Sequence, residues 1–196
     1  MIPTSRIERK LTEYIHRAYP LSSEVIRQLA DRASVKKISR SDILCAEGEI
    51  FDKLVFVSEG IFRISRIMNG EDDTIAFGEE GDPYLSLATY LYDQPSLWSY
   101  NPVTDGEVIM VDNQDLRELV DTTELMNWFN RVLLRQVHAL ENRYVWLGQQ
   151  DAYSRYLRLQ KLRPDVFNNV PLKYIASYLG VTQSTLSRIR ARIVGK

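Results

Sequence analysis

The segment PLKYIASYLGVTQSTLSRIRA occupies residues 171–191 and predicts two short helices joined by a tight turn. Ala176 is small where two crossing helices come closest, and Gly180 stands where the turn needs a left-handed backbone, which glycine adopts without steric cost. Thr182 is a suitable N-cap for the second helix, and Pro171 suits the first turn of the first helix. The apolar positions that would join the helices are Ile175, Leu179, Val181, Leu186 and Ile189. This is the pattern of a helix-turn-helix.

The second helix of this motif, about 183–194, presents polar side chains that suit the major groove of DNA. Arg188 can bind a guanine through two hydrogen bonds, and neighbouring amide and hydroxyl groups can bind base edges or phosphates. Further lysine and arginine side chains suit phosphate contacts. The predicted DNA-contacting residues are Lys173, Thr182, Gln183, Ser184, Ser187, Arg188, Arg190 and Arg192. A helical hairpin that serves only for packing is the alternative reading of this segment.

The charge distribution divides the chain in the same place. Residues 143–196 carry ten basic and two acidic side chains, a net charge of +8, whereas residues 1–142 carry 15 basic and 24 acidic side chains, a net charge of −9. An acidic body with a basic C-terminal quarter predicts a polyanionic partner, here double-stranded DNA. A basic surface that is merely solvated is the alternative.

Several classes of protein are excluded by composition and motif. The single cysteine, Cys45, rules out a disulfide within one chain and an iron–sulfur cluster held by four thiolates, and we expect it to be buried because it ends an apolar run. His16 and His138 lack metal-ligand spacing. The N-terminus does not resemble a secretory signal, and no apolar run reaches the ~20 residues of a membrane span. No nucleophile elbow, Walker A loop or dinucleotide fingerprint is present. We expect a cytoplasmic protein that is not an enzyme and needs no metal or cofactor.

The elements before the motif fall into three groups. Residues 5–19, where Ser5 and Glu8 are spaced as a capping box, and a segment beginning at Ser22 predict two helices. Short β-type runs separated by turn signals then extend from Val35 to about Val111 and predict a small antiparallel β-roll or barrel. A long helix follows over about 122–147, starting from Asp121 and Glu124. The predicted division is 1–121 for a sensor domain, 122–148 for the long helix and 149–196 for the DNA-binding domain.

The long helix would measure ~39 Å, which is more than a small β-roll can cover. Its surplus apolar face needs another surface, and a second copy of the chain is the simplest one. The predicted dimerisation residues are Leu125, Phe129, Val132, Leu133, Leu140 and Tyr144. A core helix packed wholly on its own domain is the alternative.

Taken together, these parts resemble the Crp/Fnr family of bacterial transcription regulators over about Leu29 to Ile193. The resemblance is carried by the segments 47–49 (Glu-Gly-Glu), 54–60 (Leu-Val-Phe-Val-Ser-Glu-Gly) with Arg63, and 80–82 (Glu-Gly-Asp), with the long helix and the helix-turn-helix. It implies an α+β fold: an N-terminal antiparallel β-roll of the double-stranded β-helix or jelly-roll kind with flanking helices, a long dimerisation helix, and a C-terminal helix-turn-helix domain. It also implies that an effector in the β-roll shifts the long helices and so sets the spacing of the recognition helices.

One departure from the family concerns the effector. Nucleotide-binding members have Gly-Glu after the Gly-Asp pair and, about ten residues later, Arg with a small residue, which hold the cyclic phosphate and the ribose. Here Leu85-Ser86 and Ser96-Leu97 take those places, and residues 67–116 contain eleven acids and no lysine or arginine. Arg131 or Arg135 of the long helix could reach into this pocket, but this would be a weak substitute for the missing arginine. We therefore expect no binding of cyclic AMP in the family manner.

The degenerate pocket is predicted to involve Tyr84, Leu85, Ser86, Ser96, Leu97 and Trp98. Aromatic residues are concentrated in this stretch, since Tyr90, Tyr92 and Tyr100 lie there too. They could fill the space that a nucleotide would occupy, which would leave the protein without an effector or fixed in one state. The alternative is that they line a site for a neutral or cationic small molecule.

A second departure lies at the C-terminus. Family members usually follow the recognition helix with a two-stranded wing that contacts the DNA backbone, whereas this chain stops at Lys196. We therefore expect a domain without a full wing, weaker DNA binding and a shallower salt dependence.

Two functions remain. The first is a dimeric, sequence-specific regulator of the Crp/Fnr type that reads a palindrome with half-sites ~34 Å apart, with a second copy of itself, double-stranded DNA and RNA polymerase as candidate partners. The second is an effector-binding or protein-interaction module of the cyclic-nucleotide-binding fold with a vestigial DNA-binding domain. Exposure of Arg188 and Gln183 on a common surface in a two-fold dimer favours the first, and their burial against the β-roll or across the dimer favours the second.

Overall fold

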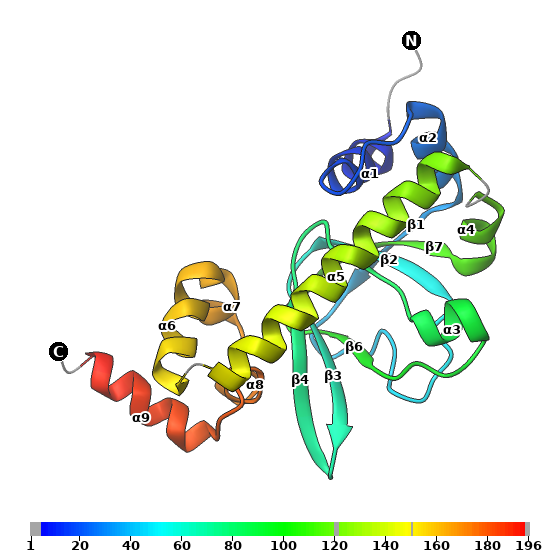
Figure 1. Cartoon of the computed structure of the whole chain (residues 1–196). Helices are drawn as coiled ribbons and strands as arrows, with labels where there is room; N and C mark the ends of the chain where they lie inside the picture. The colour runs from blue at the N-terminus through cyan, green and yellow to red at the C-terminus, as the bar shows by residue number, and fades with distance from the viewer. Residues whose placement is uncertain (1–4, 120–121, 150, 195–196) are drawn as a thin grey trace.

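The structure is a computed structural model that describes residues 5–119, 122–149 and 151–194. The predicted boundary between sensor domain and long helix, at Asp121, falls outside the described residues, as does Lys196. The chain folds into a β-roll with helices around it, one long helix, and a helical C-terminal domain (Figure 1). The predicted order of elements is therefore confirmed.

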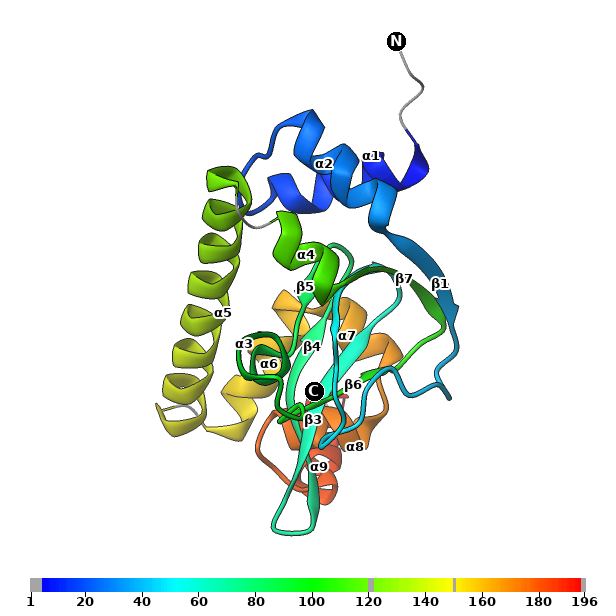
Figure 2. The same cartoon turned by 90° about the vertical axis from the view of Figure 1, so that its right-hand side faces the viewer.

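The β-roll consists of two antiparallel sheets. One has the strand order β1-β7-β2-β5 and the other the order β4-β3-β6. The strands are β1 (Ser34–Ile38), β2 (Lys53–Glu59), β3 (Phe62–Met68), β4 (Glu71–Gly78), β5 (Pro83–Tyr84), β6 (Ser99–Pro102) and β7 (Gly106–Asp112). The β3–β4 hairpin projects from the roll and lies beside the C-terminal domain, as Figures 1 and 2 show. Its turn at Asn69 and Gly70 has positive φ at both residues, as a two-residue hairpin turn requires.

Nine helices are described. They are α1 (Arg6–His16), α2 (Ser23–Arg32), α3 (Leu87–Tyr92), α4 (Asn113–Leu119), α5 (Thr123–Gln149), α6 (Ala152–Leu162), α7 (Pro164–Asn169), α8 (Leu172–Tyr178) and α9 (Gln183–Val194). The capping box of α1 forms as predicted, because Ser5 accepts from the Glu8 amide and the Glu8 side chain accepts from the Ser5 amide. Ser22 occupies the N-cap position of α2 but makes no side-chain capping bond.

The sensor part has two hydrophobic cores. One joins α1, α2, α4, strands β2 and β7, and the first turns of α5. The other fills the interior of the roll and includes Cys45, which is buried as expected. A third core holds α6–α9 together and also takes in Ile61 and Phe77 from the roll, so the C-terminal domain is packed on the sensor part rather than suspended from it.

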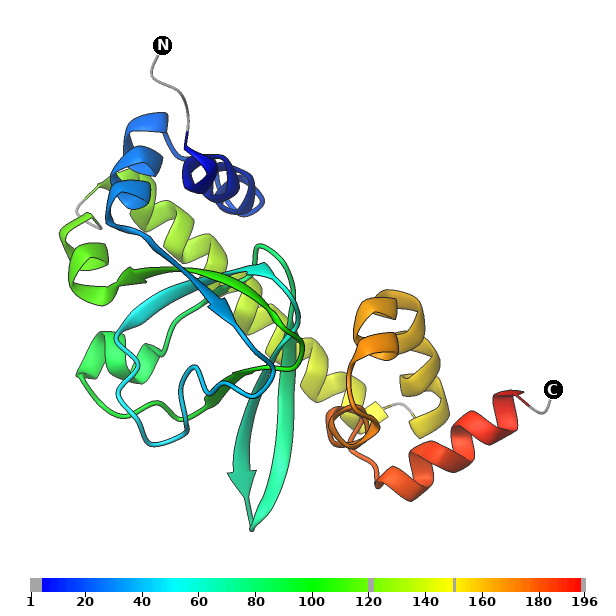
Figure 3. The same ribbon diagram turned by 180° about the vertical axis from the view of Figure 1, so that it is seen from behind.

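The long helix α5 has 27 residues and a length of about 40 Å. Its first turns are buried, since Leu125 and Trp128 belong to the core shared with α1 and α2. From Leu134 onward its apolar side chains are largely exposed: Leu134, Val137, Leu140, Tyr144 and Val145. The prediction of Leu125 as a dimerisation residue was therefore wrong, because the protomer's own α-helices cover it completely. The second half of α5 extends beyond the roll to the C-terminal domain (Figure 3).

Truncation of Leu125 tests this assignment. Leu125→Ala removes a fully buried side chain and should lower the free energy of unfolding by about 2–5 kcal/mol. The matched control is Ile43→Ala, at a side chain that is 68% exposed, which should change stability by less than about 0.5 kcal/mol. Urea unfolding at one fixed protein concentration measures both, and equal effects of the two variants would contradict the core assignment.

Candidate DNA-binding surface and effector pocket

The helix-turn-helix forms as the sequence predicts. Gly180 has φ of +65°, and the turn is closed by hydrogen bonds from the Gly180 amide to Ser177 O (2.9 Å) and from the Val181 amide to Ala176 O (3.0 Å). Thr182 caps α9, because its Oγ1 accepts from the Thr185 amide at 3.2 Å. A side chain at Gly180 would also press on Leu147 of α5, so glycine serves both the backbone and the packing.

The predicted DNA-contacting residues gather on the surface of this domain. Six of them on α8, the turn and the first turns of α9 are exposed: Lys173, Thr182, Gln183, Ser184, Ser187 and Arg188. Arg192 is exposed further along α9, and Arg190 is half-buried beside the ring of Phe167. In Figures 1 and 3, α9 lies on the side of the domain that faces away from the β-roll. Arg188 and Gln183 are both exposed in the protomer, and their exposure on a common surface of a two-fold dimer stays a prediction.

Thr185 is a residue of this surface that sequence reasoning missed. Its Oγ1 lies 3.0 Å from Thr182 Oγ1 and accepts from Arg188 Nη2 at 3.3 Å. These contacts link the N-cap to Arg188 along one face of the first turn of α9. The i, i+3, i+6 spacing of 182, 185 and 188 is the signal that could have found it.

Two arginines of the basic segment do not belong to this surface. Arg155 is buried, with Nε donating to Leu179 O (2.9 Å) and Nη1 to Leu147 O (3.2 Å). Arg163 donates to Phe77 O (3.1 Å) and pairs with Asp165 at 2.8 Å. Arg155 ties the C-terminal domain to the end of α5, and Arg163 attaches this domain to the roll. The net charge of the segment therefore overstates the charge that faces solvent.

The degenerate cassette is brought together around α3. Leu85 and Ser86 lead into α3, and Ser96, Leu97 and Trp98 follow it. Ser86 Oγ accepts from the Thr89 amide at 3.3 Å, and Ser96 Oγ donates to Trp98 O at 2.8 Å. Leu97 points to solvent and is 61% exposed. The two hydroxyls are thus used within the chain, and none of these side chains supplies a positive charge.

Aromatic side chains occupy the interior beside the cassette. Tyr100 stacks on Phe51 with a centroid distance of 5.1 Å and meets Tyr84 edge-on at 6.0 Å. Burial raises the pKa of both tyrosines, so they stay neutral. A Cβ at Gly78 would lie 1.4 Å from Tyr84 Oη, which means that glycine is required for Tyr84 to enter the core. The rings of Tyr84 and Tyr100 therefore both belong to the packed interior.

The other aromatics of this stretch do not form one wall with Tyr84 and Tyr100. Tyr90 stacks on Phe129 of α5 at 5.5 Å, and Tyr92 is exposed. Trp98 is half-buried and lies near the guanidinium of Arg66. These five residues thus divide among the core, the contact with α5, and the surface.

Little open space remains for a ligand here. A cavity of about 20 Å³ lies between α3 and α5, lined by Leu85, Leu87, Phe129 and Leu133 among others, which is room for about one water molecule. Arg135 is directed elsewhere, since its Nη1 donates to Arg17 O at 3.3 Å. A larger hollow of about 550 Å³ lies beside β1 and β7, but Asp42, Glu59, Asp105 and Glu107 line it with Lys37 as the one cation of its lining. Neither space suits an anionic nucleotide.

Comparison with known proteins agrees with this architecture. Residues 35–123 match the family model of the cyclic nucleotide-binding domain. FixK2 from Bradyrhizobium japonicum is 18% identical with a TM-score of 0.73, covering 83% of this chain and 85% of its own. The c-di-GMP responsive global regulator CLP of Xanthomonas campestris is 12% identical with a TM-score of 0.73, covering 89% and 92%. The catabolite activator protein of Thermus thermophilus is 18% identical with a TM-score of 0.57, covering 89% and 84%. No curated protein has significant sequence similarity to the chain.

Residues 35–123 therefore correspond to a cyclic nucleotide-binding domain, and the chain shares its fold with FixK2, CLP and the catabolite activator protein of Thermus thermophilus. Its β-roll, flanking helices and C-terminal helices confirm the predicted fold class. Of these neighbours, CLP is described as a global regulator and the Thermus thermophilus protein as a catabolite activator protein. Among the described residues, no helix is both long and apolar enough to span a bilayer, and no group of three or more His, Cys, Asp or Glu side chains is placed to hold a metal ion.

The pocket makes a clear prediction for cyclic nucleotides. Titration calorimetry with cyclic AMP should show no binding at micromolar concentrations, because the cassette lacks a cationic donor and Tyr84 and Tyr100 occupy the interior. Adding a donor alone should not restore binding, so Ser96→Arg should behave like the unmodified protein. Micromolar binding by the unmodified protein would contradict the description of the pocket as filled.

Proposed function

We propose that this protein is a dimeric, sequence-specific transcription regulator of the Crp/Fnr type that binds palindromic DNA without cyclic AMP. The observation that carries the proposal is the exposed polar face at the start of α9, where Gln183, Ser184, Ser187 and Arg188 stand together with nothing of the chain covering them. A helix with free amide, hydroxyl and guanidinium groups at its N-terminal end is suited to base edges in the major groove. Lys173 and Arg192 flank this face as phosphate contacts.

The exposed apolar face of α5 supports dimerisation. Met126, Leu133, Val137, Leu140 and Tyr144 follow one another at spacings of seven, four, three and four residues, which is the pattern of a coiled-coil seam. Asn130 falls on the same seam, and a single asparagine there favours two helices in register. Of the residues predicted for the dimer, Leu133, Leu140 and Tyr144 belong to this seam, whereas Phe129 and Val132 pack mainly on the roll. A two-fold axis along α5 would place one recognition helix on each side.

The comparisons support the class of function. CLP is described as a c-di-GMP responsive global regulator, so the fold serves regulators whose effector is not cyclic AMP. For this chain we propose that no anionic nucleotide occupies the cassette. A cytoplasmic location, the absence of enzymatic activity, and contact with RNA polymerase are parts of the same proposal.

Selection of genomic DNA fragments with the purified, ligand-free protein at two salt concentrations tests DNA reading. We expect a palindromic motif to be recovered, and Arg188→Ala to weaken binding to it by about 1–3 kcal/mol because a bidentate base contact is lost. The control is Arg158→Ala, which removes an exposed arginine from α6, outside the proposed contact surface. Recovery of only salt-sensitive binding without a motif would instead favour a vestigial DNA-binding domain.

A charge placed on the seam of α5 tests dimerisation. Val137→Glu puts a carboxylate on each side of the axis and should raise the dimer Kd by about a hundredfold or more, because an unpaired buried charge costs about 3–5 kcal/mol. Leu162→Glu is the control, since Leu162 is a similarly exposed leucine on α6. Light scattering over a concentration series reads the result, and a dimer unaffected by Val137→Glu would exclude α5 as the interface.

A further inference from the structure

The outer edge of strand β4 is covered by the DNA-binding domain. Because β4 is the edge strand of its sheet, backbone groups on its free side need partners from elsewhere. The Thr74 amide donates to Ser177 Oγ of α8 at 2.7 Å, and Thr74 O accepts from Arg143 Nη2 of α5 at 2.8 Å. A bulge between Ile64 and Ser65 in the pairing with β3 lies beside this point and turns the strand locally.

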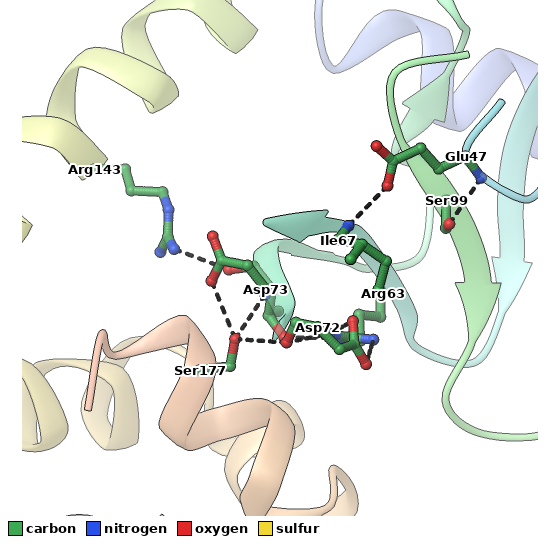
Figure 4. Close-up of polar contacts among 9 residues, drawn as sticks. Glu47, Arg63, Ile67, Asp72, Asp73, Ser99, Arg143 and Ser177 are labelled. Carbon is green, nitrogen blue, oxygen red and sulfur yellow. Dashed lines mark hydrogen bonds and ion pairs between the residues drawn. The ribbon is translucent and has the colours of Figure 1, made fainter. Parts of the chain in front are cut away.

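The same two side chains hold α8 from a second direction. Arg143 Nη1 also donates to Tyr178 O at 2.9 Å, and its guanidinium lies 4.5 Å from the Tyr178 ring centroid. Ser177 Oγ is 3.1 Å from Asp73 Oδ1, which accepts its proton. Figure 4 shows Arg143 of α5 and Ser177 of α8 meeting at this part of the strand. One residue of α5 thus ties together the long helix, the roll and the helix-turn-helix.

A buried arginine of the roll completes this contact. Arg63 on β3 is 5% exposed and makes a bidentate pair with Asp72, at 2.6 and 3.0 Å, with Nε donating to Thr74 Oγ1 at 2.8 Å. Its guanidinium lies 4.0 Å from the ring centroid of Tyr174 on α8. The planar group is therefore fixed by Asp72 in the plane and by the aromatic ring on its face, an arrangement that allows little tilting of α8.

We propose that Arg63, Asp72, Thr74, Arg143 and Ser177 form an orientation clamp that presets the angle of the recognition helix for palindromic DNA. This proposal rests on the function proposed above. The clamp holds α8 and leaves the exposed face of α9 free, so the clamped arrangement is compatible with DNA binding. In a dimer, both recognition helices must reach their half-sites together. Once one recognition helix is bound, a fixed orientation raises the effective concentration of the other recognition helix at its half-site.

The test compares a palindrome with a single half-site. Arg143→Gln and Ser177→Ala each remove a clamp contact, and Asn142→Ala changes an exposed neighbour on α5 as a control. Fluorescence anisotropy should show about a tenfold rise in Kd for the palindrome and less than about a twofold change for the half-site. Equal weakening on both DNAs, or no change on either, would overturn the clamp. Absence of any palindrome preference in the unmodified protein would instead count against the proposed function.

A second measurement does not depend on DNA. Hydrogen exchange of residues 71–78 should become faster in Arg143→Gln and Ser177→Ala, because the Thr74 edge loses its cover, while α1 and α2 keep their protection. Unchanged exchange in β4 would overturn the clamp, and faster exchange throughout the chain would show that the variants act by general destabilisation, which also overturns it.

Discussion

The unpaired edge of strand β4 is the constraint around which the two parts of this protein are arranged. Its sheet has three strands, and the hairpin that carries it projects beyond the roll. Backbone groups along such an edge must be satisfied, and here α8, Arg143 and Arg163 supply donors and acceptors to Thr74 and Phe77. The C-terminal helix-turn-helix domain is consequently a structural part of the body, because its core includes Ile61 and Phe77 of the roll.

The filled interior and the clamp point to the same conclusion about regulation. Within the described residues, the cassette provides no cation, and Tyr84 and Tyr100 take up its inner space. A ligand can move a conformational equilibrium only through differential affinity for the two states. When the pocket is packed with the chain's own side chains and the DNA-binding domain is tied to the roll, one arrangement dominates. A regulator built in this way would act according to its abundance rather than the level of a nucleotide.

Local sequence signals were sufficient for much of this account. The spacing of Gly180 and Thr182 predicted the turn and the cap, and the short apolar β-type runs at residues 54–57 and 108–111 predicted two central strands. The two-residue strand β5 and the four-residue β6 were not predicted, because such short segments leave no periodicity to read. The apolar stripe of α5 was predicted. Periodicity does not tell which part of this stripe is buried within the protomer, so Leu125 was wrongly assigned to the dimer interface.

The clamp could not have been predicted from the sequence for a different reason. Its members are separated by as many as 114 positions between Arg63 and Ser177, and no local pattern distinguishes Arg143 from the solvent-facing arginines of the basic segment. No local pattern distinguishes Arg155 and Arg163 either. Both were counted in the charge of the basic segment, but in the structure they donate to the backbone carbonyls of Leu179 and Phe77. The net charge of a segment predicts the kind of partner, whereas the packing of the folded chain decides which charged side chains are exposed and can contact that partner.

In the proposed dimer, the two DNA-binding domains are held in one orientation without a ligand. A spin label at Gln160→Cys on the exposed side of α6 reports the distance between them by double electron–electron resonance, and Cys45 does not interfere because burial raises the pKa of its thiol to about 11. We expect one narrow distance distribution that is the same in the free dimer, with cyclic AMP, and on palindromic DNA. A broad distribution in the free dimer, or a shift on adding cyclic AMP, would contradict it.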